Sequence, residues 1–276
     1  MELDVNELFF WDPVALEGTP FAVNRVVLLM FIAAIACVAF FVIGSRRRAL
    51  VPKGAQNLAE MGYLFVRNNI AIDVIGPEGA RFANYLSAIF FFIFFSNLLE
   101  IVPGINFPVT SRMAIPALLA IITWFVFNIV GISKQGWKYF RDIAFPPGVP
   151  KAVYFLLTPI EIFSTFLVRP FTLAVRLFAN MVAGHVLLTI FFLFTHDFIV
   201  HNFGPTTPFG ILTLIVASVL ILFELLVISL QAYIFTMLTA SYISEAIHGH
   251  GDHDEHAPEA EPVMETEGLA AASPSR

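Results

Sequence analysis

The 276-residue sequence contains one cysteine, Cys37, and little charge, since Asp, Glu, Lys and Arg make up only 13% of it. One cysteine cannot form a disulfide or a cysteine-based metal site within the chain. Soluble domains carry about 25% charged residues, so this shortage excludes an ordinary soluble enzyme. No basic face exists outside the loops, which argues against nucleic acid as a partner. A glycine-rich phosphate loop is also lacking, so we expect no nucleotide and no other cofactor.

Apolar residues dominate instead: they make up 58% of the chain, Phe occurs 31 times, and the mean hydropathy is +0.81. The acids concentrate at the ends, with five acids and no base in residues 1–24 and eight acids and one base in residues 245–276. Acidic ends around a basic, apolar middle indicate an all-α polytopic membrane protein. We expect an acidic external segment over 1–24, a membrane domain over 25–246 and a disordered, His- and acid-rich cytoplasmic tail over 247–276.

Five apolar stretches are long enough to cross a bilayer core of about 30 Å, which takes roughly 20 helical residues. The predicted membrane helices cover residues 26–43, 85–102, 113–132, 152–195 and 208–244. The last two have more residues than a perpendicular crossing needs. We therefore expect long antiparallel helices that are either steeply tilted or broken, and Pro159 and Pro170 are candidate breaks.

The Lys and Arg residues predict the orientation. They gather in residues 46–81 and 134–151, which five crossings place on one side of the membrane. The positive-inside rule makes that side cytoplasmic, so we expect an external N-terminus and a cytoplasmic C-terminus in a bacterial inner membrane. Residues 55–75 have apolar positions spaced like one helix face, which predicts an amphipathic helix on the inner surface.

Polar residues inside the long apolar stretches need a reason, because an ionisable group there costs about 2.5–3.5 kcal/mol on insertion scales. The candidates are Glu161, Arg169, Arg176, Asn180, His185, Glu224 and Gln231. Arg176 stands out, because apolar sequence surrounds it and a guanidinium keeps its charge at any accessible pH. The alternatives for Arg176 are a side chain that snorkels to the interface or that pairs with a buried acid to hold two helices together.

His185 and Glu224 are the pair in these spans that could titrate near neutral pH. Asn180 and Gln231 can donate and accept hydrogen bonds, in a proton path or simply between helices. In antiparallel helices, one register places Gln231 beside Arg176 and Glu224 beside His185, offset by about 3 Å along the axis. Together, these polar residues predict an aqueous path that leads in from outside and ends near the fixed positive charge of Arg176.

Three further polar features have open interpretations. Glu100 ends the second span, where it lines the path or rests at the outer interface. Arg169 directly precedes Pro170, and we interpret it as snorkelling toward the cytoplasmic interface. The tail has histidines among acids, which either chelate a metal or, as we favour, belong to a solvated disordered end. We expect no metal site.

Two runs of sequence resemble subunit a of the F-type ATP synthase, in its alphaproteobacterial and mitochondrial version. They are FLVRPFTLAVRLFANMVAGH, which ends at His185, and ELLVISLQAYIFTMLTASYIS, which begins at Glu224. The acid that ends FSNLLE, Glu100, also fits the family pattern. The resemblance implies that Arg176 is the stator arginine that faces the carboxylates of a rotating ring of c subunits. It implies a proton half-channel from outside that is lined or bordered by Asn180, His185, Glu224 and Gln231, with Glu100, Glu161 and Arg169 as further candidates.

The family implies a stator subunit that is not itself an enzyme. Its implied partners are the c-ring, peripheral-stalk b-type subunits, membrane lipid and the transported proton. A proton from outside neutralises a ring carboxylate, which can then rotate through lipid, where a charged group would cost several kcal/mol. The arginine keeps the two half-channels apart, and the membrane potential supplies about 2.3 kcal/mol per charge per 100 mV.

Two other functions remain open from the residues alone. An ion-coupled secondary transporter could use an intramembrane Arg/Glu/His relay, although an odd number of spans and the lack of an internal repeat argue against paired halves. A structural subunit of a respiratory complex would use the same polar groups only for packing.

Overall fold

The computed structural model describes residues 24–46, 53–145, 153–201 and 204–249, and within these ranges it contains helices and turns but no strand. The α-helices are α2 (Arg25–Ser45), α3 (Ala55–Val66), α4 (Asp73–Ile75), α5 (Ala83–Leu98), α6 (Ala114–Gln135), α7 (Trp137–Ala144), α8 (Tyr154–Phe163), α9 (Arg169–His196) and α10 (Thr207–His248). Wider π-helical turns form η1 (Arg67–Ile72), η4 (Ser164–Val168) and η5 (Asp197–His201), and short 3₁₀ turns form η2 (Pro77–Arg81) and η3 (Val109–Ser111).

The prediction of an all-α polytopic membrane protein is confirmed. In the described part of the chain, four helical stretches are long and apolar enough to cross a membrane: Arg25–Ser45, Ala114–Gln135, Tyr154–Val200 and Thr207–His248. The fifth expected span, over 85–102, is the shorter apolar helix α5, which ends at Leu98. Its last predicted turn is missing because the chain turns from Leu99 onward, ahead of Pro103.

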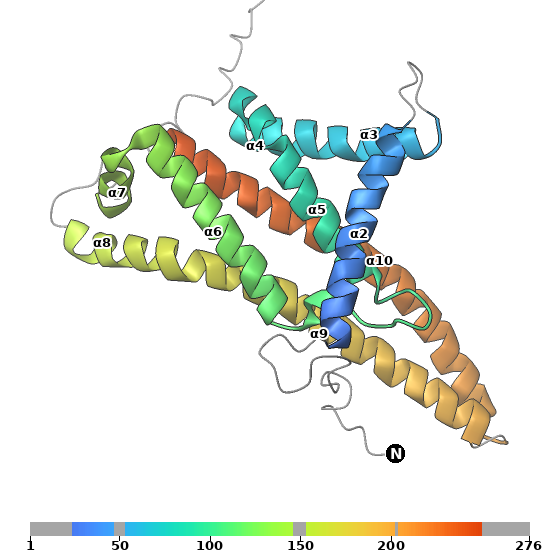
Figure 1. The fold of residues 1–276 in the computed structure, drawn as a ribbon. Coiled ribbons are helices and arrows are strands. Elements are labelled where there is room, and N and C mark those ends of the chain that lie inside the picture. Colours follow the sequence, from blue (N-terminus) through green and yellow to red (C-terminus); the bar gives the residue numbers. More distant parts are fainter. Residues whose placement is uncertain (1–23, 47–52, 146–152, 202–203, 250–276) are drawn as a thin grey trace, which may run out of the picture.

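The amphipathic helix expected over 55–75 is present as α3, η1 and α4, which follow one another without a gap. α3 crosses the end of α2 in Figure 1. Leu58 and Met61 on the apolar face are exposed, whereas Ala59 and Val66 on the opposite side are buried against the rest of the chain. A helix with this division is suited to lie in the membrane interface.

The long stretch before the last connection is one continuous helix of 47 residues, from Tyr154 to Val200. At 1.5 Å per residue it measures about 70 Å, more than twice the bilayer core, so it must be steeply tilted. Pro159 and Pro170 do not break it. The π-helical turn η4 ends at Val168, two residues before Pro170, and its wider spacing relieves the clash of the proline ring with the preceding turn.

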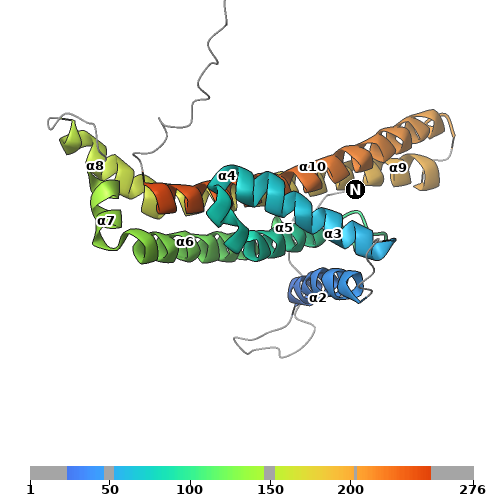
Figure 2. The same ribbon diagram turned by 90° about the horizontal axis from the view of Figure 1, so that it is seen from above.

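α9 and α10 lie antiparallel along most of their length, as both views show (Figures 1 and 2). Leu177 and Met181 of α9 pack with Ile228 and Phe235 of α10 in one of the buried apolar clusters. α5 and α6 cover this pair, and α2 packs on the outer side of α5.

The molecule has two ends. The hairpin end contains the α5–α6 connection, residues 99–113, and the α9–α10 connection; the α3 end contains α3, α4, α7 and the C-terminal end of α10 (Figure 1). Some of the predicted features lie outside the described residues. They are the segment 1–23, Arg47 and Arg48, Lys151 and the His-rich tail beyond Gly249.

Candidate functional site

A cluster of two carboxylates and one histidine is buried toward the hairpin end. Glu100 follows α5, His185 is on α9 and Glu224 is on α10, and all three are buried. His185 Nδ1 lies 3.6 Å from Glu100 Oε1, and Glu224 interacts electrostatically with Glu100. Burying two carboxylates in one place requires that protons or a cation be shared among them. The cluster can therefore hold a mobile proton.

Gly184 brings the α9 backbone against the Glu224 carboxylate. A Cβ atom at position 184 would lie 2.5 Å from both carboxylate oxygens. The group that approaches α9 at this glycine is therefore the Glu224 carboxylate. Glu224 is level with residue 184, so the prediction that Glu224 and His185 lie at the same depth agrees with the structure.

A cavity of about 1070 Å³ opens at the hairpin end and reaches this cluster. Glu100 and His185 line it together with Arg25, Thr189 and His196. Arg25 donates hydrogen bonds to the Ile105 and Gly104 carbonyl oxygens, at 3.0 and 3.5 Å, and so joins the start of α2 to the hairpin. The cavity has room for many waters and for the polar partners that hold them.

Arg176 lies near the middle of the continuous helix Tyr154–Val200 and is exposed on the surface of the chain. Among the described residues, no carboxylate forms an ion pair with its guanidinium within 4.0 Å. Gln231, which the predicted register placed beside Arg176, instead accepts a hydrogen bond from Asn180 Nδ2 at 2.7 Å. A fixed charge exposed on an apolar helix needs a counter-charge from outside the chain.

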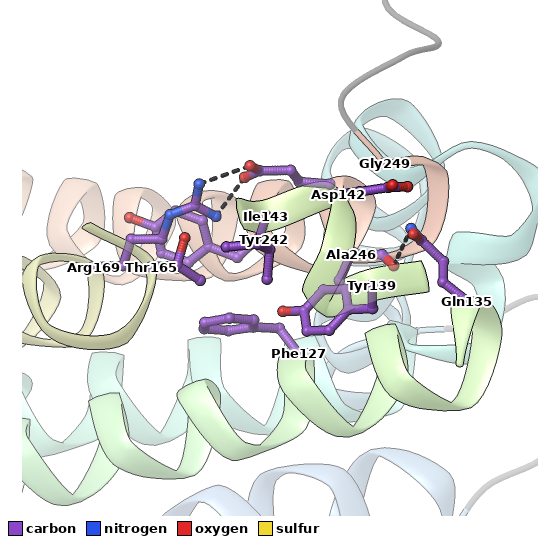
Figure 3. A pocket seen from close by; sticks show the side chains of 11 residues that line it. Phe127, Gln135, Tyr139, Asp142, Ile143, Thr165, Arg169, Tyr242, Ala246 and Gly249 are labelled. Atoms are coloured by element: carbon purple, nitrogen blue, oxygen red, sulfur yellow. Dashed lines mark hydrogen bonds and ion pairs between the residues drawn. The ribbon is translucent and has the colours of Figure 1, made fainter. Parts of the chain in front are cut away.

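The interpretation of Arg169 as a snorkelling side chain is wrong. Its guanidinium donates two hydrogen bonds to Glu245, at 2.5 and 2.7 Å, and lies 5.2 Å from the centre of the Tyr242 ring. Figure 3 shows Arg169, Tyr242 and Tyr139 around one small pocket, whose volume of about 20 Å³ suits one water molecule. This half-buried bidentate pair satisfies the guanidinium of Arg169 directly, so the side chain does not need to reach the membrane interface.

The role of Glu245 is not predicted from the sequence, where this residue stands with the acids of residues 245–276. The signal available was an acid at the end of a long apolar run, opposite an arginine near the start of the antiparallel partner. Glu161, on α8, lies within electrostatic reach of Arg169 and away from the cluster at Glu100. Among the described residues, no group of three or more His, Cys, Asp or Glu side chains is arranged to hold a metal ion.

Comparisons with known proteins agree with this architecture. A family model described as ATP synthase A chain matches residues 27–244. Among curated proteins, the chain is 45% identical over 250 residues to an ATP synthase subunit a from Rhodococcus erythropolis, covering 90% of both chains. It is 45% identical over 258 residues to one from Frankia alni, covering 90% of this chain and 88% of the relative. It is 42% identical over 220 residues to one from Gluconacetobacter diazotrophicus, covering 79% and 86%.

Proposed function

The chain belongs to the ATP synthase A chain family, and we propose that it is the stator subunit that conducts protons through the membrane sector of the ATP synthase. The secondary transporter is not favoured, since the relatives are ATP synthase subunits. The subunit does not catalyse ATP chemistry on its own; that chemistry belongs to other subunits of the synthase. A purely structural role leaves the open cavity and the buried acids without a purpose.

The observation that carries the proposal is the contrast along α9. A large cavity leads to an acid–histidine cluster, and beyond it an exposed arginine has no carboxylate partner within the described chain. We assign the missing partner to a ring of c subunits, whose carboxylates would pass Arg176 one after another. Peripheral-stalk b-type subunits would hold the chain still against the turning ring.

The proton path follows from the groups at each level. Water in the cavity brings protons to Glu100 and His185, and Glu224 passes them toward the ring. Asn180 and Gln231 border the path where it meets the arginine. Because Arg176 cannot lose its proton, it favours an ionised ring carboxylate and repels protons, which separates the inlet from the outlet. Glu161 and Arg169 lie on the other side of Arg176 along the helix, toward the outlet.

The orientation follows from the basic loops. The described parts of residues 46–81 and 134–151 lie toward the α3 end (Figure 1), and these two segments carry most of the Lys and Arg, so this end would face the cytoplasm of a bacterial inner membrane. The hairpin end and the cavity would face outside, with the N-terminus outside and the C-terminus in the cytoplasm.

A conservative substitution tests the role of Arg176. We expect Arg176→Lys to abolish ATP-driven proton pumping in inverted vesicles that contain the assembled synthase, because an ammonium within the membrane can deprotonate and a guanidinium cannot. Arg81→Lys is the matched control, since Arg81 is exposed on the turn η2, and should leave pumping unchanged. Near-normal pumping by the Arg176→Lys synthase, with assembly verified, would contradict the proposal.

A further inference from the structure

Two arginines share one face of α9, but in the part of the chain that the structure describes only one has a carboxylate partner. Arg169 and Arg176 are seven residues apart, which is close to two full helical turns and about 10 Å along the axis. Arg176 is exposed, and no ion pair to it forms among the described residues. Arg169 is paired with Glu245 through two hydrogen bonds, and the two side chains are only 17% and 25% exposed.

Groups from three elements surround Arg169. α8 contributes Glu161, α7 contributes Tyr139 and Asp142, and α10 contributes Tyr242 and Glu245. Asp142 is itself 3.8 Å from Lys138 and 3.7 Å from Arg141. Glu245 is therefore the one carboxylate among these groups that makes direct hydrogen bonds to the Arg169 guanidinium.

The charges of both arginines reach the same region. The Tyr242 phenol, which lies beside Arg169, is also subject to the charge of Arg176. Two unit charges about 10 Å apart, at an effective dielectric constant of about 20, change a protonation equilibrium by roughly an order of magnitude. An uncompensated Arg169 would therefore act on any carboxylate that stands at Arg176.

We propose that Glu245 is a positioning residue that cancels the charge of Arg169, so that a passing ring carboxylate meets one fixed positive charge instead of two. The inference rests on the proposed function. Without Glu245, the second positive charge on the same helix face would hold the ring carboxylate in its ionised form. That carboxylate would take up a proton less readily and leave the stator more slowly.

Glu245→Gln in the complete synthase tests the inference. A lipid-soluble carbodiimide reacts with the protonated form of a buried carboxyl group. The complete synthase is labelled at a series of pH values and the label on the ring subunit is then measured, so that the labelling rate reports protonation of the ring carboxylate. We expect the pH of half-maximal labelling to fall by about one unit, which is the tenfold effect estimated above, and ATP-driven proton pumping to slow about tenfold.

Two partner variants separate charge cancellation from a structural latch. Arg169→Gln leaves the negative charge of Glu245 uncovered, so the labelling midpoint should rise. The double variant Arg169→Gln/Glu245→Gln removes both charges, and its midpoint should return to that of the unmodified synthase. Glu78→Gln is the control, because it breaks an exposed ion pair with Lys134 at the same end of the molecule and should shift nothing.

The inference is overturned if the labelling midpoint of Glu245→Gln does not shift. It is also overturned if the midpoint of the double variant is shifted as far as that of either single variant. In both cases the Arg169–Glu245 pair would only hold α9 and α10 together. If Glu245→Gln does not assemble, the comparison of Arg169→Gln with the double variant decides, since removal of Glu245 must restore the midpoint there. Normal pumping by Arg176→Lys would instead overturn the proposed function, so the two failures are distinguishable.

Discussion

At the scale of single residues, the same residue type performs opposite tasks a short distance apart. Arg169 is half-buried against Glu245, which satisfies its charge inside the chain, whereas Arg176 projects from the same helix without such a partner among the described residues. The difference does not come from the arginines, because both follow apolar residues on one helix. It comes from what α10 presents at each level: an acid opposite Arg169 and apolar or amide side chains further along.

Gly184 offers a test at this scale. We expect Gly184→Ala to displace the Glu224 carboxylate, because the new methyl group would lie 2.5 Å from its oxygens. Overpacking of this kind costs about 1–3 kcal/mol. A free-energy increase of about 1.4 kcal/mol for the position in which Glu224 transfers protons corresponds to a tenfold change. We therefore expect the proton-pumping rate to drop about tenfold.

Gly62→Ala is the steric control for this substitution. A Cβ atom at Gly62 would lie 2.6 Å from the Phe91 ring, far from any acid of the cluster. This variant should lower thermal stability while the pumping rate per assembled synthase stays normal. Equal pumping losses in both variants would show that Gly184 matters only for packing.

At the scale of elements, the antiparallel register of α9 and α10 decides which polar groups meet. The pair Thr195 and Thr213, near the connection, share a hydrogen bond of 3.0 Å between their hydroxyl oxygens. Toward the α3 end, Asn180 bonds Gln231 and Arg169 bonds Glu245. The partner of each α9 residue shifts progressively along α10, because two long helices cross at an angle and do not stay level.

Disulfide crosslinking tests this register. In a Cys37→Ala background, cysteines introduced by Thr195→Cys and Thr213→Cys should form a disulfide, since the side chains already touch. Thr195→Cys with Ser218→Cys should not, because Ser218 is five residues further along α10, about 7.5 Å away. Disulfides need Cα atoms about 4.4–6.8 Å apart, so gel mobility after mild oxidation distinguishes the two. Preferential crosslinking of the second pair would refute the register.

At the scale of the whole molecule, the steep tilt of the long helices and the position of the hairpin produce a large open cavity at the hairpin end. The hairpin after α5 carries Glu100 back toward α9, and Arg25 fastens this hairpin to α2. The cavity is therefore built from four parts of the chain that are far apart in sequence: the start of α2, the hairpin, the C-terminal half of α9 with η5, and α10 at Ile221. It stops at the acid–histidine cluster, where Phe107 packs 5.6 Å from the His185 ring.

Sided labelling tests the cavity and the orientation together. A water-soluble, membrane-impermeant thiol reagent should label Thr189→Cys, in a Cys37→Ala background, from outside in intact cells, because Thr189 lines the open cavity. Gln56→Cys, which lines a pocket between α2 and α3 at the opposite end, should be labelled only in inverted vesicles. Labelling of Thr189→Cys only from the cytoplasmic side would show that the orientation is reversed.

The sequence by itself determined the apolar helices, the antiparallel order of the last two and the family, because helix length and hydropathy follow from local composition. It also singled out Arg176, His185 and Glu224, since polar groups in apolar runs are conspicuous. It did not determine which polar residues contact each other. These contacts are the proximity of Glu100 to His185, the hydrogen bond from Asn180 to Gln231, and the ion pair of Arg169 with Glu245. α5 and α10 are apolar on every side, so no amphipathic stripe fixes their rotation about their own axes. Only packing against their neighbours decides which residues face each other, and that packing exists only in the tertiary structure.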